Sequence, residues 1–250
     1  MDGRFVMRWH CGYRLGLLLS LAGTQLLALP VSRAETPWSA SLGVTSDYIF
    51  RGVSQTYDSA AVQLGATYLN PQGWFAGAWA SNVNPYPHAG SSAELDLYAG
   101  ITRPLGADFS TRIAYTRYSY LDDPRPANYN YDEIAVSAAY LDRLAATLSY
   151  EPDYSSYSTL GFAHSRPVGA LELTAHWPLP NDLAVTAGVG YYDLQSMFGV
   201  SYWAGNAGLA YVRGRVTIEL NRFFTNGTAG RLYAEQSANG TWTLSALLRL

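Results

Sequence analysis

The stretch Trp38–Gly52, WSASLGVTSDYIFRG, carries the pattern that the rest of the chain repeats. Its even positions are mostly apolar, up to Tyr48 and Phe50, and the positions between them are small, polar or charged. This period of two predicts a β-strand with one apolar and one polar face. The alternation exceeds a usual globular strand of about 5 to 6 residues and suffices for a tilted membrane-spanning strand, which needs roughly 9 to 11. We therefore expect a membrane-crossing strand whose aromatic end, Tyr48 and Phe50, meets the lipid headgroups.

The first 34 residues have the features of an export signal. Three arginines precede the apolar run Leu15–Leu29, and small residues follow at Ser32 and Ala34. This order is typical of a signal peptide. We expect cleavage between Ala34 and Glu35, which leaves residues 35–250 as the mature domain. A membrane-anchor helix is the alternative, but the uncharged span is barely long enough to cross a bilayer.

The composition of the mature chain excludes several classes of function. Losing one acid and four arginines with residues 1–34 changes the acidic count from 19 to 18 and the basic count from 16 to 12, a net charge of −6. Nucleic-acid binding requires a basic excess, so we expect no nucleic-acid partner. The single cysteine, Cys11, lies in the expected signal peptide, so no disulfide or thiolate metal site is expected.

Eleven further segments alternate in the same way. They cover residues 60–69, 74–83, 93–102, 108–120, 131–140, 144–151, 169–177, 183–192, 202–212, 215–224 and 241–250. No apolar run after Leu29 approaches the length of a membrane helix. The fold class predicted is therefore all-β, a transmembrane antiparallel up-and-down β-barrel of twelve strands. A soluble sandwich or lipocalin-like barrel also alternates, but the faces opposite the apolar ones are polar or small and supply no large core.

The links between these segments alternate in length. Short links cover residues 70–73, 103–107, 141–143, 178–182 and 213–214, and longer links cover 52–59, 84–92, 121–130, 152–168, 193–201 and 225–240. Outer-membrane barrels have short periplasmic turns and long outer loops, and an even strand count places both termini in the periplasm. A fourteen-strand alternative adds 158–166 and 230–236, but it places the long 193–201 link on the short-turn side.

Four stretches resemble a known family. They are SDYIFRGVSQT (46–56), GWFAGAWASNV (73–83), AELDLYAGI (93–101) and YEPDYSS (150–156). They are similar to the TorF-like porin family, also called Gcw_chp, over most of the mature chain. The resemblance implies an outer-membrane barrel whose substrate is largely undefined.

The sequence offers little for catalysis or cofactor binding. His176 shares the polar face of its strand with Glu172 and Thr174, which is more often simply hydrated. Nucleophile elbows, phosphate loops and paired-histidine metal spacings do not occur in the sequence. We therefore expect no enzyme activity, no cofactor and no metal site.

Two functions of different class remain. The first is a porin that passes small polar solutes by passive diffusion, and the second is a closed structural or interaction barrel whose surface loops bind a partner. An outer-membrane hydrolase is a distant third. A twelve-strand lumen can be open or filled by side chains, and small residues on the polar face, such as Gly65, Gly100 and Gly190, favour an open one.

Charged residues on the polar faces predict the selectivity of such a pore. Seven acids and three bases are expected to line it: Asp47, Glu94, Asp96, Glu133, Glu151, Glu172 and Glu219, with Arg51, Arg112 and Arg249. An acid-lined channel attracts cations, so mild cation selectivity is expected. Glu94 and Asp96 should contribute most, because a two-residue spacing puts them on one face, roughly 7 Å apart.

Two arginines interrupt the apolar faces. Arg117 follows Ile113 and Tyr115, and Arg222 follows Ile218 and Leu220, each at the long-loop end of its segment. An arginine there can lay its stem on the apolar surface and reach lipid phosphates. We expect both to contact outer-membrane lipid or lipopolysaccharide, with simple hydration as the alternative. The sequence does not define the oligomeric state.

Overall fold

The computed structural model describes residues 37–84, 92–121, 130–155, 157–158, 161–162, 165–233, 238 and 240–250. The expected signal peptide, 1–34, and its cleavage site at Ala34 and Glu35 lie outside these residues. Within them, no helix is long and apolar enough to cross a membrane.

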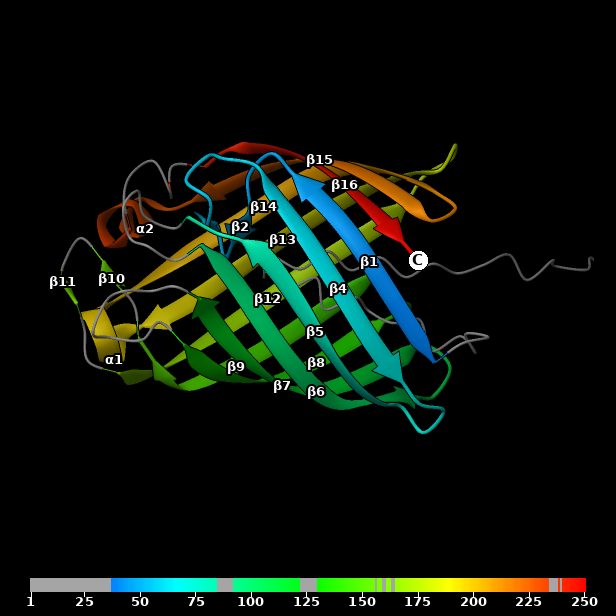
Figure 1. The fold of residues 1–250 in the computed structure, drawn as a ribbon, viewed down its shortest axis with the longest axis horizontal. Coiled ribbons are helices and arrows are strands. Elements are labelled where there is room, and N and C mark those ends of the chain that lie inside the picture. Colours follow the sequence, from blue (N-terminus) through cyan, green and yellow to red (C-terminus); the bar gives the residue numbers. More distant parts are fainter. Residues whose placement is uncertain are drawn as a thin grey trace, which may run out of the picture.

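Twelve strands form one closed antiparallel barrel, as the alternation predicts (Figure 1). In chain order they are β1 (Trp38–Thr45), β4 (Ala61–Leu69), β5 (Trp74–Asn82), β6 (Ala93–Leu105), β7 (Phe109–Leu121), β8 (Tyr131–Tyr140), β9 (Leu144–Tyr154), β12 (Arg166–Pro178), β13 (Leu183–Leu194), β14 (Val200–Arg213), β15 (Val216–Thr225) and β16 (Trp242–Arg249). The barrel closes where β1 pairs with β16, with Leu42 opposite Leu248. Closure leaves no strand edge unpaired.

The two ends of the barrel differ. Tight turns and the C-terminus lie at one end, and the longer links lie at the other (Figure 1). The long-link end carries two short strands, β10 (Tyr157–Ser158) and β11 (Gly161–Phe162), and two short helices, α1 (Gln195–Phe198) and α2 (Gly227–Leu232). The fourteen-strand alternative is therefore wrong, because β10 and β11 pair only with each other and α2 is helical.

The apolar side chains of the barrel face outward. In β6, Leu97 is 51% exposed whereas its neighbour Asp96 is 0% exposed. The same contrast recurs around the barrel, with large apolar side chains outside and acids, threonines and asparagines inside. A soluble barrel would bury its apolar face instead, so the arrangement suits an apolar surrounding such as lipid.

The first strand is shorter than expected. β1 ends at Thr45, and the chain then forms a ribbon of two short strands, β2 (Ile49–Phe50) and β3 (Val53–Ser54). Residues 46–60, which we call the inner loop, contain this ribbon. Tyr48 and Phe50 are only 2% and 8% exposed, so their predicted place at the headgroups is wrong. The alternation breaks at Ser46, a polar residue at an apolar position, and the chain turns inward there.

Candidate binding site inside the barrel

The inner loop is held in shape by Asp47. One carboxylate oxygen of Asp47 accepts hydrogen bonds from Ser54 Oγ (2.6 Å) and Thr56 Oγ1 (2.7 Å). The Tyr48 amide in turn donates to Thr56 Oγ1 (3.0 Å). Burial raises the pKa of Asp47, and the bonds from Ser54 and Thr56 act in the opposite direction. Asp47 thus closes the loop on itself rather than extending β1.

Aromatic contacts fasten the inner loop to one wall of the barrel. Tyr48 packs edge-on against Trp79 of β5, with ring centroids 5.4 Å apart, and Phe50 lies 6.0 Å from Tyr118 of β7. Such pairs contribute beyond the area that they bury. The loop therefore lies against β5 and β7 at its start.

The turn of the ribbon reaches the opposite wall. Arg51 and Gly52 have left-handed φ values of 51° and 79°. A Cβ on Gly52 would lie 2.5 Å from Ala204 Cβ and 2.7 Å from Thr225 Cγ2, so only glycine fits against β14 and β15. Tyr202 Oη donates to the carbonyl oxygen of Arg51 (3.2 Å). Together with the aromatic contacts, these interactions show that the inner loop crosses the lumen.

Arg51 forms the main charge contacts of the crossing loop. Its two terminal nitrogens bind Glu133 of β8 and Glu151 of β9 in separate ion pairs. All three side chains are buried, with Glu151 fully so. Burial on its own lowers the pKa of Arg51, but the attraction of Glu151, Glu133 and Glu172 outweighs it and raises that pKa. Arg51 is therefore charged.

Aromatic rings complete the surroundings of Arg51. Its guanidinium carbon lies 4.9 Å from the centroid of Phe50 and 5.5 Å from that of Tyr192. Tyr192 Oη donates to Glu172 Oε1 (2.8 Å). We call Glu133, Glu151, Glu172, Phe50 and Tyr192 the acid–aromatic cage. The cage thus consists of three carboxylates and two aromatic rings, and the cation that occupies it is Arg51.

Glu94 and Asp96 form a second acidic group on β6. Both are buried, at 1% and 0% exposure, and Tyr120 Oη donates to Glu94 Oε1 (3.3 Å). Neither carboxylate forms an ion pair within the described residues. The two acids therefore lie together on one wall of the interior without a basic partner there.

The remaining charges lie nearer the tight-turn end. Glu219 accepts a hydrogen bond from Thr186 (2.7 Å), and Arg249 Nη1 donates to Thr217 (3.3 Å). The Arg112 guanidinium lies 3.9 Å from the centroid of Phe75. These residues do not join the cage.

Small inward residues leave less room than expected. A Cβ on Gly190 would lie 2.3 Å from Tyr192 Oη, and one on Gly100 would lie 2.5 Å from the Phe75 ring. Neighbouring rings therefore occupy the space that these glycines provide. Sequence reasoning missed Tyr192 and the inward turn itself, and it assigned Phe50 to the lipid headgroups, although the break at Ser46 was a visible signal.

The two rim arginines have protein partners. Arg117 Nη1 binds Asp132 (2.9 Å), which also accepts a hydrogen bond from Tyr115 Oη (2.6 Å). Arg222 lies over Trp242, 5.9 Å from its centroid. Asp132 thus neutralises the charge of Arg117. The contact with the uncharged Trp242 ring does not neutralise Arg222.

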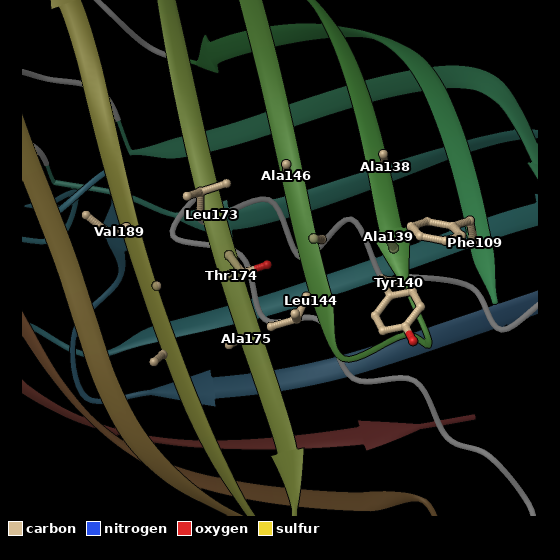
Figure 2. A pocket seen from close by; sticks show the side chains of 13 residues that line it. Phe109, Ala138, Ala139, Tyr140, Leu144, Ala146, Leu173, Thr174, Ala175 and Val189 are labelled. Atoms are coloured by element: carbon tan, nitrogen blue, oxygen red, sulfur yellow. The ribbon is translucent and has the colours of Figure 1, made fainter.

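A hollow of about 590 Å³ lies on the outer face of β7, β8, β9, β12 and β13 (Figure 2). Alanines such as Ala146 and Ala175 form part of it, with Tyr140, Leu144 and Leu173 around them. Its lining is apolar, like the surface around it, so it is unlike a site for polar solutes. The candidate site is therefore the interior.

Comparisons with known proteins agree with this architecture. A family model described as "Bacterial protein of unknown function (Gcw_chp)" matches residues 32–241. No curated protein matches. Among solved structures, the KdgM porin is 12% identical with a TM-score of 0.53, and the NanC porin is 10% identical with a TM-score of 0.56. Each likeness covers 84% of this chain and 98% of the other, and at such identity it shows the fold alone.

Proposed function

Because the chain belongs to the Gcw_chp family and folds as a porin-like barrel, we propose that it is an outer-membrane porin for small polar solutes, with a mild preference for cations. The observation that carries this proposal is the charge of the interior. Seven acids and three bases give a formal net charge of −4. Charges beside a narrow, low-dielectric channel act strongly on a passing ion.

The excess charge is distributed unevenly. Arg51 offsets part of the cage, whereas Glu94 and Asp96 have no basic partner within the described residues. Two acids without a basic partner in the described part of the chain thus lie together on β6, and we infer that this wall is where a passing cation is attracted.

A closed structural or interaction barrel is the second candidate. The crossing of the lumen by the inner loop favours it, because contacts with β5, β7, β9 and β14 fill the long-link end. In such a barrel the acids and arginines stabilise the interior rather than guide a solute.

Liposome swelling separates the two candidates. Refolded protein in liposomes is diluted into isosmotic arabinose, maltose or raffinose, with protein-free liposomes as the control. We expect swelling that becomes slower as the sugar becomes larger, because a narrow lumen sieves by size. Rates equal to those of protein-free liposomes for all three sugars would favour the closed barrel.

Lipid contacts at the rim belong to the same proposal. Arg222 forms no ion pair within the part of the chain that the structure describes and lies beside exposed Trp242, so we expect it to bind lipopolysaccharide phosphate. We expect Arg117 to do so less, because Asp132 already binds it. Lipopolysaccharide should raise the Tm of wild-type protein more than that of Arg222→Ala, and equal shifts would refute the contact.

A further inference from the structure

We propose that the acid–aromatic cage is a binding site for an organic cation of the guanidinium class, and that Arg51 occupies it as a tethered internal ligand. The inference rests on the proposed cation pathway, and it names the chemistry of the solute that the pathway recognises. It also assigns the inner loop a role as a competitor of that solute.

The cage matches the shape of a guanidinium group. That group is planar, offers five N–H donors in a fixed fork and stacks on aromatic faces. In the structure this group is that of Arg51. Glu133 and Glu151 each bind one of its terminal nitrogens, and the ring centroids of Phe50 and Tyr192 lie 4.9 and 5.5 Å from its central carbon. Carboxylates combined with aromatic faces are the usual means of recognising such cations.

The cage and its occupant belong to different parts of the fold. Glu133, Glu151, Glu172 and Tyr192 come from β8, β9, β12 and β13, which are neighbours in the barrel wall. Arg51 comes from the β2–β3 ribbon of the inner loop, and this ribbon pairs with no barrel strand. Four of the five cage residues therefore belong to the barrel wall and not to the loop that carries Arg51.

The cage has more acceptors than Arg51 uses. Glu133 and Glu151 bind Arg51 while Glu172 acts on it electrostatically, and both Glu151 Oε2 and Arg51 Nε are buried with no hydrogen-bond partner among the residues described. Buried charge without a partner is costly. A free alkylguanidinium carries the same five donors as arginine, but it is not tied to the loop and can turn an N–H group towards this oxygen.

Chemical rescue tests the inference. Arg51→Ala removes the occupant and leaves the wall of the cage, and ethylguanidinium chloride supplies the missing group. The readout is the Tm of refolded protein. We expect a saturable rise of about 3 °C in Arg51→Ala and a much smaller one in wild type, where Arg51 competes.

Two controls make the result specific. Tetramethylammonium chloride at equal concentration supplies charge without N–H donors, and Arg51→Ala/Glu151→Gln lacks one acid of the cage. Neither should give the saturable rise. Equal shifts with both salts, or in both variants, would overturn the proposal.

Refolding provides a second measurement. If Arg51→Ala refolds poorly, ethylguanidinium present during refolding should restore the yield, and failure to restore it would overturn the proposal. Neither Tm nor refolding yield requires conductance. Ethylguanidinium can therefore bind to a closed barrel, and it can also fail to bind to a barrel that conducts. The two proposals are therefore distinguishable.

Discussion

Arg51 is the residue on which the charge balance at the long-link end depends. Its loss leaves Glu133 and Glu151 buried without a cation. We expect Arg51→Ala to lower the free energy of unfolding in urea by about 3–5 kcal/mol, the usual effect of breaking a buried pair. Arg213→Ala is the control, since Arg213 is the exposed last residue of β14. Equal stability of the two variants would contradict the account of Arg51.

Glu94 and Asp96 are the two residues that we expect to contribute most to the cation preference. Glu94→Gln/Asp96→Asn removes two interior charges with little change in volume, so we expect the reversal potential in a KCl gradient to move towards zero. Asp132→Asn is the matched control, because Asp132 binds Arg117 at the rim. An unchanged reversal potential in the double variant would show that these acids do not act on passing ions.

Individual side chains were predictable only in part. The parity of a strand assigns Glu94 and Asp96 to the face opposite Leu97, and the structure places them there. The meeting of Arg51 with Glu151, 100 positions later in the chain, was not predictable. It depends on the inner loop entering the lumen. The break at Ser46 signals an interruption of the strand, but it does not predict how far the loop extends or which wall it reaches.

The inner loop is the element that fills part of the barrel interior, and its packing against β14 can be tested. Gly52→Ala should destabilise it, because the new Cβ would lie 2.5 Å from Ala204 Cβ at a left-handed φ. Gly106→Ala is the control, since Gly106 has a similar φ of 72° with no atom within 4 Å of the new Cβ. Both variants carry backbone strain, so only a larger loss of unfolding free energy for Gly52→Ala agrees with a loop packed on β14.

The barrel strands were more predictable than the links. Turn-forming residues and link lengths gave twelve strands and their order, because tight turns leave adjacent strands no other partner. The predicted bounds of the link 193–201 were too wide, because β13 continues to Leu194 and β14 begins at Val200. The short helix α1 forms the connection between them. Loops that fold on tertiary contacts, such as 46–60 and 227–232, carry no period that identifies them.

The orientation of the whole molecule is testable because the mature chain is expected to lack cysteine. With the tight turns in the periplasm, an impermeant thiol reagent on intact cells should label Asn226→Cys at the long-link end. Gly106→Cys, in the turn between β6 and β7, should be labelled only after the outer membrane is permeabilised. Labelling of Gly106→Cys but not of Asn226→Cys on intact cells would show that the tight turns face outward.

Ion selectivity tests the central claim, an acid-lined passive channel, most directly. Purified and refolded protein is inserted into a planar bilayer, and the reversal potential is measured across a potassium chloride gradient. The interior net charge of −4 predicts a measurable conductance with a potential of the sign for potassium permeation. Anion preference, or no conductance at all, would contradict it.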